Sequence, residues 1–398
     1  MPSAPLAGIL VVDLTRFLPG PLTAKLLADL GARVVKVEEP TMGDPVRLAP
    51  PLVRGKSALA AMLLAGVESL ALDLKQEGAR EVLAALLGQA DVLLESFRPG
   101  TLARLGFPPG EIAERHPRLV VCSLSGYGAD GPQAGRAGHD LTYQALAGTL
   151  APTARMPAVP VADHAGAWAA ALAVVAALHR RHETGRGAVI DASLYDAALH
   201  TNLVGWAEEA AAPRAVGSAL PLSGSLACYN LYRTADGGTV AIACLEARFW
   251  RRFCSVVERP DLVKLHLDTA PATRKRVQEL VGGRSRDAWE ALAIEHDLPI
   301  EPVLSAAEAT DHPQARHRGV VTTGPDDLPR LGFPARIDGL RPEAGERLPR
   351  IGDDTGALLA ELGLEWSPGE RRAAGVGRRG GWKRALARWR IRRRGPKG

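Results

Sequence analysis

Short apolar runs alternate with amphipathic stretches along the first half of the chain. Runs such as residues 9–14 are almost wholly apolar, as in a strand that is buried on both faces of a sheet. Longer stretches with apolar residues at helical spacing separate these runs, and the first of them, 22–30, ends at Gly31. The expected strands are residues 9–14, 33–38, 69–74, 91–94, 119–124 and 188–193. This alternation predicts an α/β fold with a Rossmann-like, mainly parallel sheet.

The same pattern predicts how the chain is divided. The strands above, together with a long Ala-rich helix over 165–183, predict a large α/β domain over residues 1–195. A stretch rich in Ala, Pro, Gly and Ser follows, so we place a linker over 196–225. Two strands joined by a turn open a smaller α+β domain over 226–315. The Pro- and Gly-rich segment 316–376 is expected to return to the large domain.

Composition places the chain among soluble globular proteins. It has 398 residues, of which 46% are hydrophobic and 23% charged. The cysteines show no C-x-x-C pairing, so we expect free thiols and neither a zinc site nor a disulfide framework. No uninterrupted apolar stretch reaches the roughly 18 residues of a membrane span, and the N-terminus has no signal-peptide pattern. We therefore expect a cytoplasmic protein.

The formal charge of +5 is concentrated at one end of the chain. Ten of the 49 basic residues and none of the 44 acidic ones lie in 377–398, so the remainder carries a formal charge of −5. Apolar residues at helical spacing between these basic residues would suit an amphipathic helix on nucleic acid or an anionic membrane. A solvated, disordered tail is the interpretation that we favour over such a contact.

Ionisable residues stand at three places where the expected strands and helices begin or end. His139 and Asp140 precede a helix from Leu141, where backbone N–H groups could bind an anion or a developing oxyanion. Asp163 opens the long Ala-rich helix, and Glu246 ends an apolar strand. Each also has a plain structural interpretation, because acids often cap helices and charges at strand ends are often solvated.

The turn after the first strand gives no support to one large class of enzymes, those that bind a nicotinamide dinucleotide. It reads Thr15-Arg16-Phe17-Leu18-Pro19-Gly20, without the Gly-x-Gly-x-x-Gly pattern of a dinucleotide-binding loop. A nicotinamide enzyme is therefore not supported. Basic residues at or near strand ends, Lys36, Lys75 and Arg98, could still contact a phosphate-bearing substrate, since ligands collect beyond the carboxyl ends of parallel strands.

Five short motifs, in this order along the chain, resemble the family III CoA-transferases, also called the CaiB/BaiF family. They are Leu18-Pro19-Gly20-Pro21, Leu27-Ala28-Asp29-Leu30-Gly31-Ala32, Leu72-Asp73-Leu74-Lys75, Phe97-Arg98-Pro99-Gly100 and Ser125-Gly126-Tyr127-Gly128. The resemblance extends from Leu6 to about Val376. It implies an enzyme that acts on acyl-CoA, and an interlocked homodimer with each active site between the large domain of one subunit and the small domain of the other.

Two segments resemble the α-methylacyl-CoA racemase branch of this family. They are Gly138-His139-Asp140, where transferases usually have an aromatic residue before the Asp, and Leu245-Glu246-Ala247-Arg248-Phe249. The resemblance implies that His139 and Asp163 exchange protons with the substrate and that Glu246 orients or polarises His139. CoA is implied as part of the thioester substrate, so no separate cofactor and no metal is expected. The CoA-contacting positions that it implies are Lys36, Leu72, Leu74, Lys75, Arg98, Arg104, Gly138 and Asp140.

Two alternatives remain open at this point. In the first, the chain is an acyl-CoA:carboxylate CoA-transferase and Asp163 is the nucleophile. In the second, it is a noncatalytic CoA-binding protein. One departure bears on all of them: residues 65–69 read Ala-Gly-Val-Glu-Ser, where the family commonly has a basic segment. A cation is therefore missing where a CoA phosphate is expected.

Overall fold

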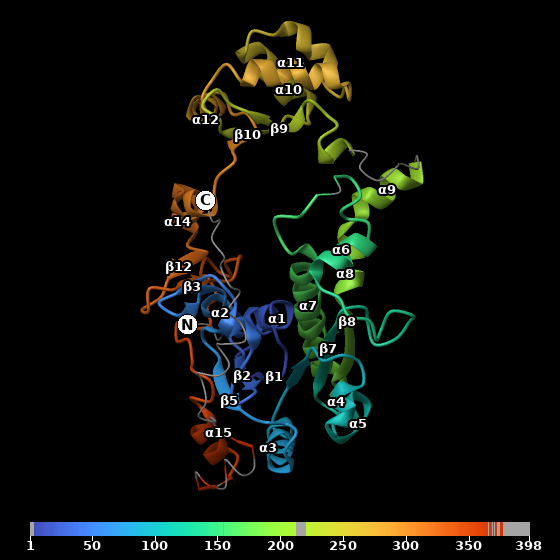
Figure 1. Cartoon of the computed structure of the whole chain (residues 1–398), viewed down its shortest axis with the longest axis vertical. Helices are drawn as coiled ribbons and strands as arrows, with labels where there is room; N and C mark the ends of the chain where they lie inside the picture. Colours follow the sequence, from blue (N-terminus) through green and yellow to red (C-terminus); the bar gives the residue numbers. More distant parts are fainter. Residues whose placement is uncertain are drawn as a thin grey trace, which may run out of the picture. The chain divides into compact units, whose positions relative to one another are not determined.

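The computed structural model describes residues 4–153, 155–211, 220–364, 366–367, 369, 371 and 375–376. Within it the chain forms two compact units (Figure 1). The first comprises Met1–Ala147, Val159–Thr201 and His317–Gly398, and the second Gly148–Ala158 and Asn202–Arg316. The chain thus leaves the first unit twice, after Ala147 and after Thr201, and returns to it each time.

A six-stranded parallel sheet forms the centre of the first unit. Its strand order is β5-β2-β1-β6-β7-β8, and every neighbouring pair is parallel. The strands are β1 (Leu10–Asp13), β2 (Arg33–Glu38), β5 (Glu68–Ala71), β6 (Val92–Glu95), β7 (Val120–Ser125) and β8 (Ala188–Ser193). The predicted α/β fold with a parallel sheet is confirmed.

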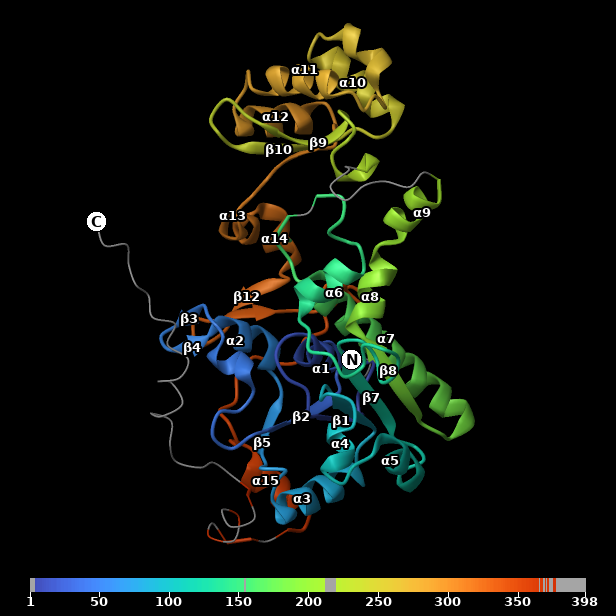
Figure 2. The same ribbon diagram turned by 45° about the vertical axis from the view of Figure 1, so that its right-hand side comes forward.

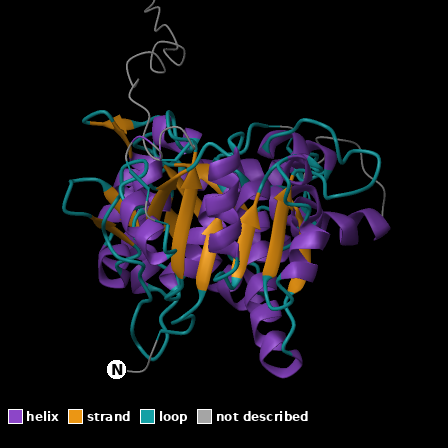
Figure 3. Cartoon of the chain, turned by 90° about the horizontal axis from the view of Figure 1, so that it is seen from below, coloured by secondary structure: helices purple, strands orange, loops and turns teal. Residues whose placement is uncertain are grey.

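Helices cover both faces of this sheet (Figure 3). Successive strand residues point to opposite faces, so Val11 and Val34 join one core while Val12 and Val35 join the other. The first core also contains residues of α1 (Pro19–Asp29), α2 (Ala58–Leu64), α6 (Asp140–Leu146), α7 (Val161–Thr184) and α8 (Leu194–Thr201). The second contains residues of α3 (Glu77–Leu87), α4 (Thr101–Arg104), α5 (Pro109–Arg115) and α15 (Thr355–Glu361). Burial on both faces explains why the strands read as continuous apolar runs.

The helix α7 is the one described helix that is long and apolar enough to cross a membrane, by length and composition. It packs against α1 and α8, and Figure 2 shows α1 beside it. Small residues such as Gly166, Ala167 and Ala170 make this approach close. Its place in the first core accounts for part of its apolar composition, since 44% of its most apolar 18-residue window is buried.

The second unit is built on a small antiparallel sheet. Its strands are β9 (Tyr229–Arg233), β10 (Thr239–Ala243) and β11 (Ile300–Pro302), in the order β11-β10-β9. The helices α10 (Ala247–Val256), α11 (Pro271–Val281) and α12 (Arg286–Glu295) pack with it around Trp250 and Trp289. Both indole N–H groups are satisfied, since they donate to the carbonyls of Leu262 and Val281, each at 3.0 Å.

All four cysteines of the chain are buried free thiols.

Parts of the chain outside the main sheets add short elements. Two hairpins, β3 (Leu52–Val53) with β4 (Lys56–Ser57) and β12 (Val321–Thr323) with β13 (Pro329–Leu331), are antiparallel. The segment that we expected as a linker, 196–225, contains most of α8 and all of α9 (Leu203–Ala211). Its residues 212–219, and the basic tail 377–398, lie outside the described residues. The remaining α-helices of the described chain are α13 (Ala306–Asp311) and α14 (Pro313–Arg318), and short 3₁₀ helices span Pro45–Leu48, Pro221–Ser223 and Pro260–Leu265.

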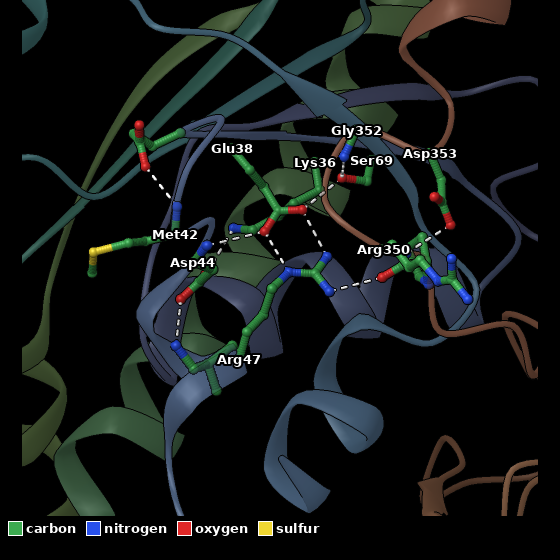
Figure 4. A network of polar contacts seen from close by, with 12 residues as sticks. Lys36, Glu38, Met42, Asp44, Arg47, Ser69, Arg350, Gly352 and Asp353 are labelled. Carbon is green, nitrogen blue, oxygen red and sulfur yellow. Dashed lines mark hydrogen bonds and ion pairs between the residues drawn. The ribbon is translucent and has the colours of Figure 1, made fainter. Parts of the chain in front are cut away.

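A buried polar network ties the returning segment to the start of the sheet (Figure 4). The Glu38 carboxylate accepts two hydrogen bonds from Arg47, from Nε at 2.6 Å and from Nη2 at 2.7 Å, and one from the Ser69 hydroxyl at 2.6 Å. Arg47 also donates to the carbonyl of Pro349 at 2.7 Å, and the Gly352 N–H donates to the Ser69 hydroxyl at 2.8 Å. Residues far apart in sequence are therefore held by one carboxylate at the end of β2.

Replacing Arg47 with Ala should destabilise the fold strongly, because Glu38 would be left buried without its cation. Burial alone would raise the pKa of Glu38, but Arg47, Ser69 and the N–H of Asp44 hold it below its ordinary value of 4.5. The pair therefore stabilises the fold fully above that pH and loses its effect as the pH falls. We expect Arg47→Ala to lower the free energy of unfolding at pH 7 by about 3–5 kcal/mol, measured by urea denaturation.

The matched control is Arg115→Ala, which removes an exposed ion pair with Glu111 on α5. Such a pair contributes less than about 1 kcal/mol. Equal losses in the two variants would show that the Glu38–Arg47 pair has no special place in the fold.

Candidate functional site

A cavity of about 620 Å³ lies at the carboxyl ends of β1, β2, β5 and β6. This edge of a parallel sheet is where ligands bind in open α/β folds. Of the positions predicted to contact CoA, the cavity wall includes Leu72, Leu74 and Lys75. The lining residues are Leu14, Thr15, Arg16, Val37, Glu38, Glu39, Gly43, Asp44, Leu72, Asp73, Leu74, Lys75, Phe97, Thr101 and Leu105.

Two other predicted positions, Arg98 and Arg104, are exposed residues of the segment that forms one side of this cavity. The Arg104 Nη2 donates to the Thr101 hydroxyl at 2.8 Å. Sequence reasoning missed a third cation, Arg16, whose guanidinium lies 5.6 Å from the centre of the Phe97 ring. Arg16 directly follows the first strand, and this position at the carboxyl end of a parallel strand was the sequence feature that pointed to ligand binding. The cavity therefore has basic residues on the side of β1 and β6.

Lys36 differs from the expectation that it contacts CoA. Its side chain is fully buried, and Nζ lies 3.0 Å from Asp13 Oδ2 and 3.2 Å from Asp44 Oδ2. Burial alone would lower the pKa of Lys36, but these two carboxylates and Glu38 raise it above its ordinary value. The ammonium is charged and enclosed by the protein's own acids. We therefore leave Lys36 out of the ligand-binding set.

The structure brings His139, Asp140 and Asp163 together at the starts of two helices. Asp140 is the first residue of α6, and His139 precedes it as an exposed N-cap residue. Asp163 lies in the first turn of α7, and its backbone N–H donates to Asp140 Oδ1 at 3.1 Å. The other oxygen of Asp140 accepts from Gln144 Nε2 at 2.6 Å. The start of α7 is thus fixed against the start of α6.

Asp163 is a weak acid in this position. Burial, and next the negative charge of Asp140, raise the pKa of Asp163 to about 7. A carboxyl group with this pKa is present in both protonation states near neutral pH. Asp163 is therefore suited to accept a proton in one direction of a reaction and to donate it in the other.

Tyr143 is a site residue that sequence reasoning did not single out. It lies on α6 with 5% exposure, and its ring fills the space between the backbones of Gly126 and Gly138. A Cβ at Gly126 would meet the tyrosine oxygen at 2.4 Å, and a Cβ at Gly138 would meet Cε1 at 2.5 Å. The sequence feature that could have pointed to Tyr143 is the pair of glycines, Gly126 and Gly138, at the two ends of the loop, since they leave room for a large ring beside the backbone. Burial raises the pKa of Tyr143 to about 12, with Tyr127 as the next cause.

Two contacts connect the cavity with the His139 side of the sheet. The Phe17 ring meets the His139 imidazole edge to face, with 6.4 Å between the ring centres, and the Phe17 N–H donates to the cavity residue Asp44 at 3.1 Å. The positive charge of Arg98 also reaches the Tyr143 hydroxyl, where it partly opposes the rise in pKa that burial causes. A ligand that extends along this edge would therefore pass from the cavity toward His139 and Asp163.

Glu246 belongs to the second unit. It is exposed and precedes α10, where its backbone carbonyl accepts from the N–H groups of Phe249 and Trp250 at 2.9 and 3.1 Å. Its predicted action on His139 stays a prediction. Among the described residues, no group of three or more His, Cys, Asp or Glu side chains is placed to hold a metal ion.

Known proteins share both the sequence pattern and the fold. The family model described as "CoA-transferase family III" matches residues 6–355. An "Acetyl-CoA:oxalate CoA-transferase" from Acetobacter aceti is 32% identical over 381 residues, which cover 91% of this chain and 96% of the relative. An "Alpha-methylacyl-CoA racemase" from Homo sapiens is 33% identical over 377 residues, covering 90% and 94%. The crystal structure of a CAIB/BAIF family protein from Brucella suis superposes with a TM-score of 0.81 at 28% identity, covering 90% of this chain and all of that one.

Adding a single methyl group at Gly138 should disturb the site, because the new Cβ would overlap the Tyr143 ring. We expect Gly138→Ala to lower the free energy of unfolding by about 1–3 kcal/mol, measured by urea denaturation. Gly135→Ala is the control in the same loop, since a Cβ there meets no atom within 4 Å. If both variants unfold like the wild type, Tyr143 is not held in place by Gly138.

Proposed function

We propose a reaction for this chain from one premise: the chain belongs to CoA-transferase family III and is an enzyme that acts on acyl-CoA. The proposed reaction is the racemisation of 2-methylacyl-CoA thioesters. The observation that carries this proposal is the contact between two helix starts, which sets Asp163 beside the Asp140 that follows His139. Two proton-transferring side chains are thereby available on neighbouring helices.

Racemisation needs one group to remove the proton from the α-carbon and a second group to return a proton to the opposite face. We assign these roles to His139 and Asp163, which exchange them according to the configuration of the substrate. Removal of the proton leaves an enolate of the thioester, whose oxygen we place near the backbone N–H of Asp140. Reprotonation by the other residue restores the thioester in either configuration, so no atom is gained or lost.

The cavity supplies a place for the CoA part of the substrate. Its apolar wall, with Leu72 and Leu74, suits the adenine, and the cations Arg16, Lys75 and Arg98 suit the phosphates, with Arg104 on the same segment as Arg98. We place Gly138 and Asp140 near the thioester. From the family resemblance we also propose that the chain forms an interlocked homodimer. In it we assign Glu246 the role of orienting His139.

A CoA-transferase reaction is the second candidate, and the 32% identity to an acetyl-CoA:oxalate CoA-transferase favours it. In that reaction the Asp163 carboxylate attacks the acyl-CoA and releases the CoA thiolate as a mixed anhydride forms. The thiolate then attacks the aspartyl carbonyl of the anhydride, which expels the donor carboxylate and gives an aspartyl-CoA thioester. The acceptor carboxylate attacks this thioester and releases the CoA thiolate as a second mixed anhydride forms. The thiolate attacks the acceptor's acyl carbonyl, which gives the new acyl-CoA and restores the Asp163 carboxylate.

Asp163, with a pKa of about 7, is present in both protonation states near neutral pH and suits either reaction. We place racemisation first because His139, which precedes Asp140, supplies the second proton-transferring group that only racemisation uses.

Isotope exchange distinguishes the two reactions. We expect the protein, given one epimer of a 2-methylacyl-CoA in D₂O without any carboxylate acceptor, to incorporate α-deuterium and to produce both epimers. His139→Ala and Asp163→Ala should each lower the epimerisation rate by about 10²–10⁴-fold, because general acid–base groups contribute that much. The control is His179→Ala, an exposed histidine on the same helix as Asp163.

The transferase reaction predicts a different result in the same experiment. There would be no exchange, CoA would move to an added carboxylic acid, and an Asp163-linked thioester would be trapped with acyl-CoA. Wild-type epimerisation by His139→Ala would remove His139 from the mechanism.

The pH dependence of epimerisation should report the charge of Asp140. Because a neighbouring negative charge raises the pKa of Asp163, Asp140→Asn should lower that pKa, part of the way from about 7 toward 3.8, since burial remains. The midpoint of the corresponding limb of kcat/KM should therefore move to lower pH, measured between pH 4 and 9 in steps of about 0.5. Asp130→Asn removes an exposed carboxylate from the same loop and should leave the midpoint in place. A profile that Asp140→Asn does not move would mean that Asp163 does not control this limb.

A further inference from the structure

The first unit contains a second cavity, of about 320 Å³, beside the Glu38–Arg47 ion pair. Glu38 lines the cavity at the ends of the strands, whereas its partner Arg47 lines the second one. The two cavities have no lining residue in common. The other lining residues of the second cavity lie in 55–60 and 348–351. Its volume is within the range of about 300–1,000 Å³ that is typical of small-molecule sites.

Every charged residue in the wall of the second cavity is a cation: Arg47, Lys56 or Arg350. Lys56 Nζ lies 3.5 Å from Asp326 Oδ2, but that carboxylate also binds Arg330 at 2.8 Å. Arg350 is exposed, and within the described part of the chain its guanidinium forms no ion pair. The wall therefore carries an excess of positive charge, which a bound anion would neutralise.

Arg47 is held in a fixed orientation and still has donors for a ligand. Its Nε and Nη2 donate to Glu38, and its Nη1 donates to the Pro349 carbonyl at 2.7 Å (Figure 4). The side chain is only 12% exposed. A guanidinium has five N–H groups, and the bonds that Arg47 makes within the described chain use three of them. The two that remain are available to a ligand, and a cation that is already fixed loses little conformational entropy on binding.

The rest of this wall is mostly apolar. Ala60, Pro349 and Ile351 are buried, and Leu348 is half-buried. An apolar wall with a few fixed polar groups is typical of a site for a small organic molecule. A ligand of this cavity should therefore have an apolar body as well as a negative charge.

We propose that the second cavity binds a small phosphate monoester. Its phosphate group contacts Arg47, Lys56 and Arg350, and its organic part lies against Leu348 and Ile351. Three cations from separate segments suit the three acceptor oxygens of such a phosphate, whereas a carboxylate offers only two oxygens in one plane. The site does not depend on the proposed reaction, because none of these residues lines the cavity that we assign to CoA.

Isothermal titration calorimetry of the full chain in a phosphate-free buffer tests this assignment with three probes: phenyl phosphate, benzoate and inorganic phosphate. Phenyl phosphate should bind about tenfold more tightly than benzoate, which has the same ring but less charge and fewer acceptors. It should also bind about tenfold more tightly than inorganic phosphate, which has no apolar part to bury. Arg350→Gln should weaken the binding of phenyl phosphate by about tenfold, because a hydrogen bond to a charged group is lost.

The matched control is Arg347→Gln, which removes an exposed arginine from the same segment. Arg347 lies outside the cavity lining and binds Asp354 at 2.7 Å, so this variant should bind phenyl phosphate like the wild type. Lys75→Gln removes a cation of the first cavity and should also leave phenyl phosphate binding unchanged. Urea denaturation should show wild-type stability for Arg350→Gln, since the side chain is exposed and forms no ion pair with described residues.

Four results would overturn the proposal. Phenyl phosphate could fail to bind, it could bind no more tightly than benzoate or inorganic phosphate, it could bind equally to the wild type and to Arg350→Gln, or CoA could displace it. In the last case the probe would lie in the first cavity. A failure of the isotope-exchange experiment would overturn the racemase reaction alone, because none of these titrations involves turnover.

Discussion

The buried ammonium of Lys36 is the interaction on which the ligand-binding edge of the sheet depends. It joins Asp13 at the end of β1 to Asp44 in the segment after β2, and a second, partly buried cation, Arg47, joins Glu38 to the returning chain. Each of these charges would cost several kcal/mol if it were buried alone. The network is therefore stable only as a whole, and its acids cannot move independently. Glu38 and Asp44 also line the cavity, so the charges that hold the edge together also fix the shape of the cavity wall.

At the other end of this edge, the charges of Asp140 and Asp163 lower the stability of the fold instead of raising it. The backbone N–H of Asp163 donates to the Asp140 carboxylate, and the raised pKa of the Asp163 carboxyl group means that its ionisation opposes folding. The folded-state pKa of about 7 lies above the ordinary 3.8, so stability is lost as the pH rises between these values. Such a cost is common where a site needs a proton to be shared between two states. Tyr143 of the same helix, α6, packs closely against Gly126 and Gly138.

The fold could be predicted from the sequence further than the site could. Buried parallel strands are continuous apolar runs, so 33–38 and 188–193 coincide with β2 and β8. The segment 196–211 was expected in a linker but is helical, and α9 has no buried residue in the described chain, so no core pattern marked it as a helix. Lys36 and Lys75 both stand at strand ends in the sequence. Only the fold shows that Lys36 is enclosed by acids while Lys75 faces the cavity. The contact of Asp140 with Asp163 is likewise made by the packing of α6 on α7, which no local pattern records.

Family membership does not choose the reaction, because the chain is 33% identical to a racemase and 32% identical to a transferase over nearly its whole length. The same fold hosts both chemistries, so the choice depends on the groups at the site. Asp163 is common to both proposed schemes, so the distinction lies with the second proton-transferring group, His139. A transferase needs the anion of Asp163 as a nucleophile and makes no use of a second base. A racemase needs Asp163 in two protonation states and a partner across the α-carbon. The proposed racemisation therefore rests on His139, which precedes Asp140 at the start of α6, together with Asp163, whose raised pKa lets its carboxyl group take part in either protonation state.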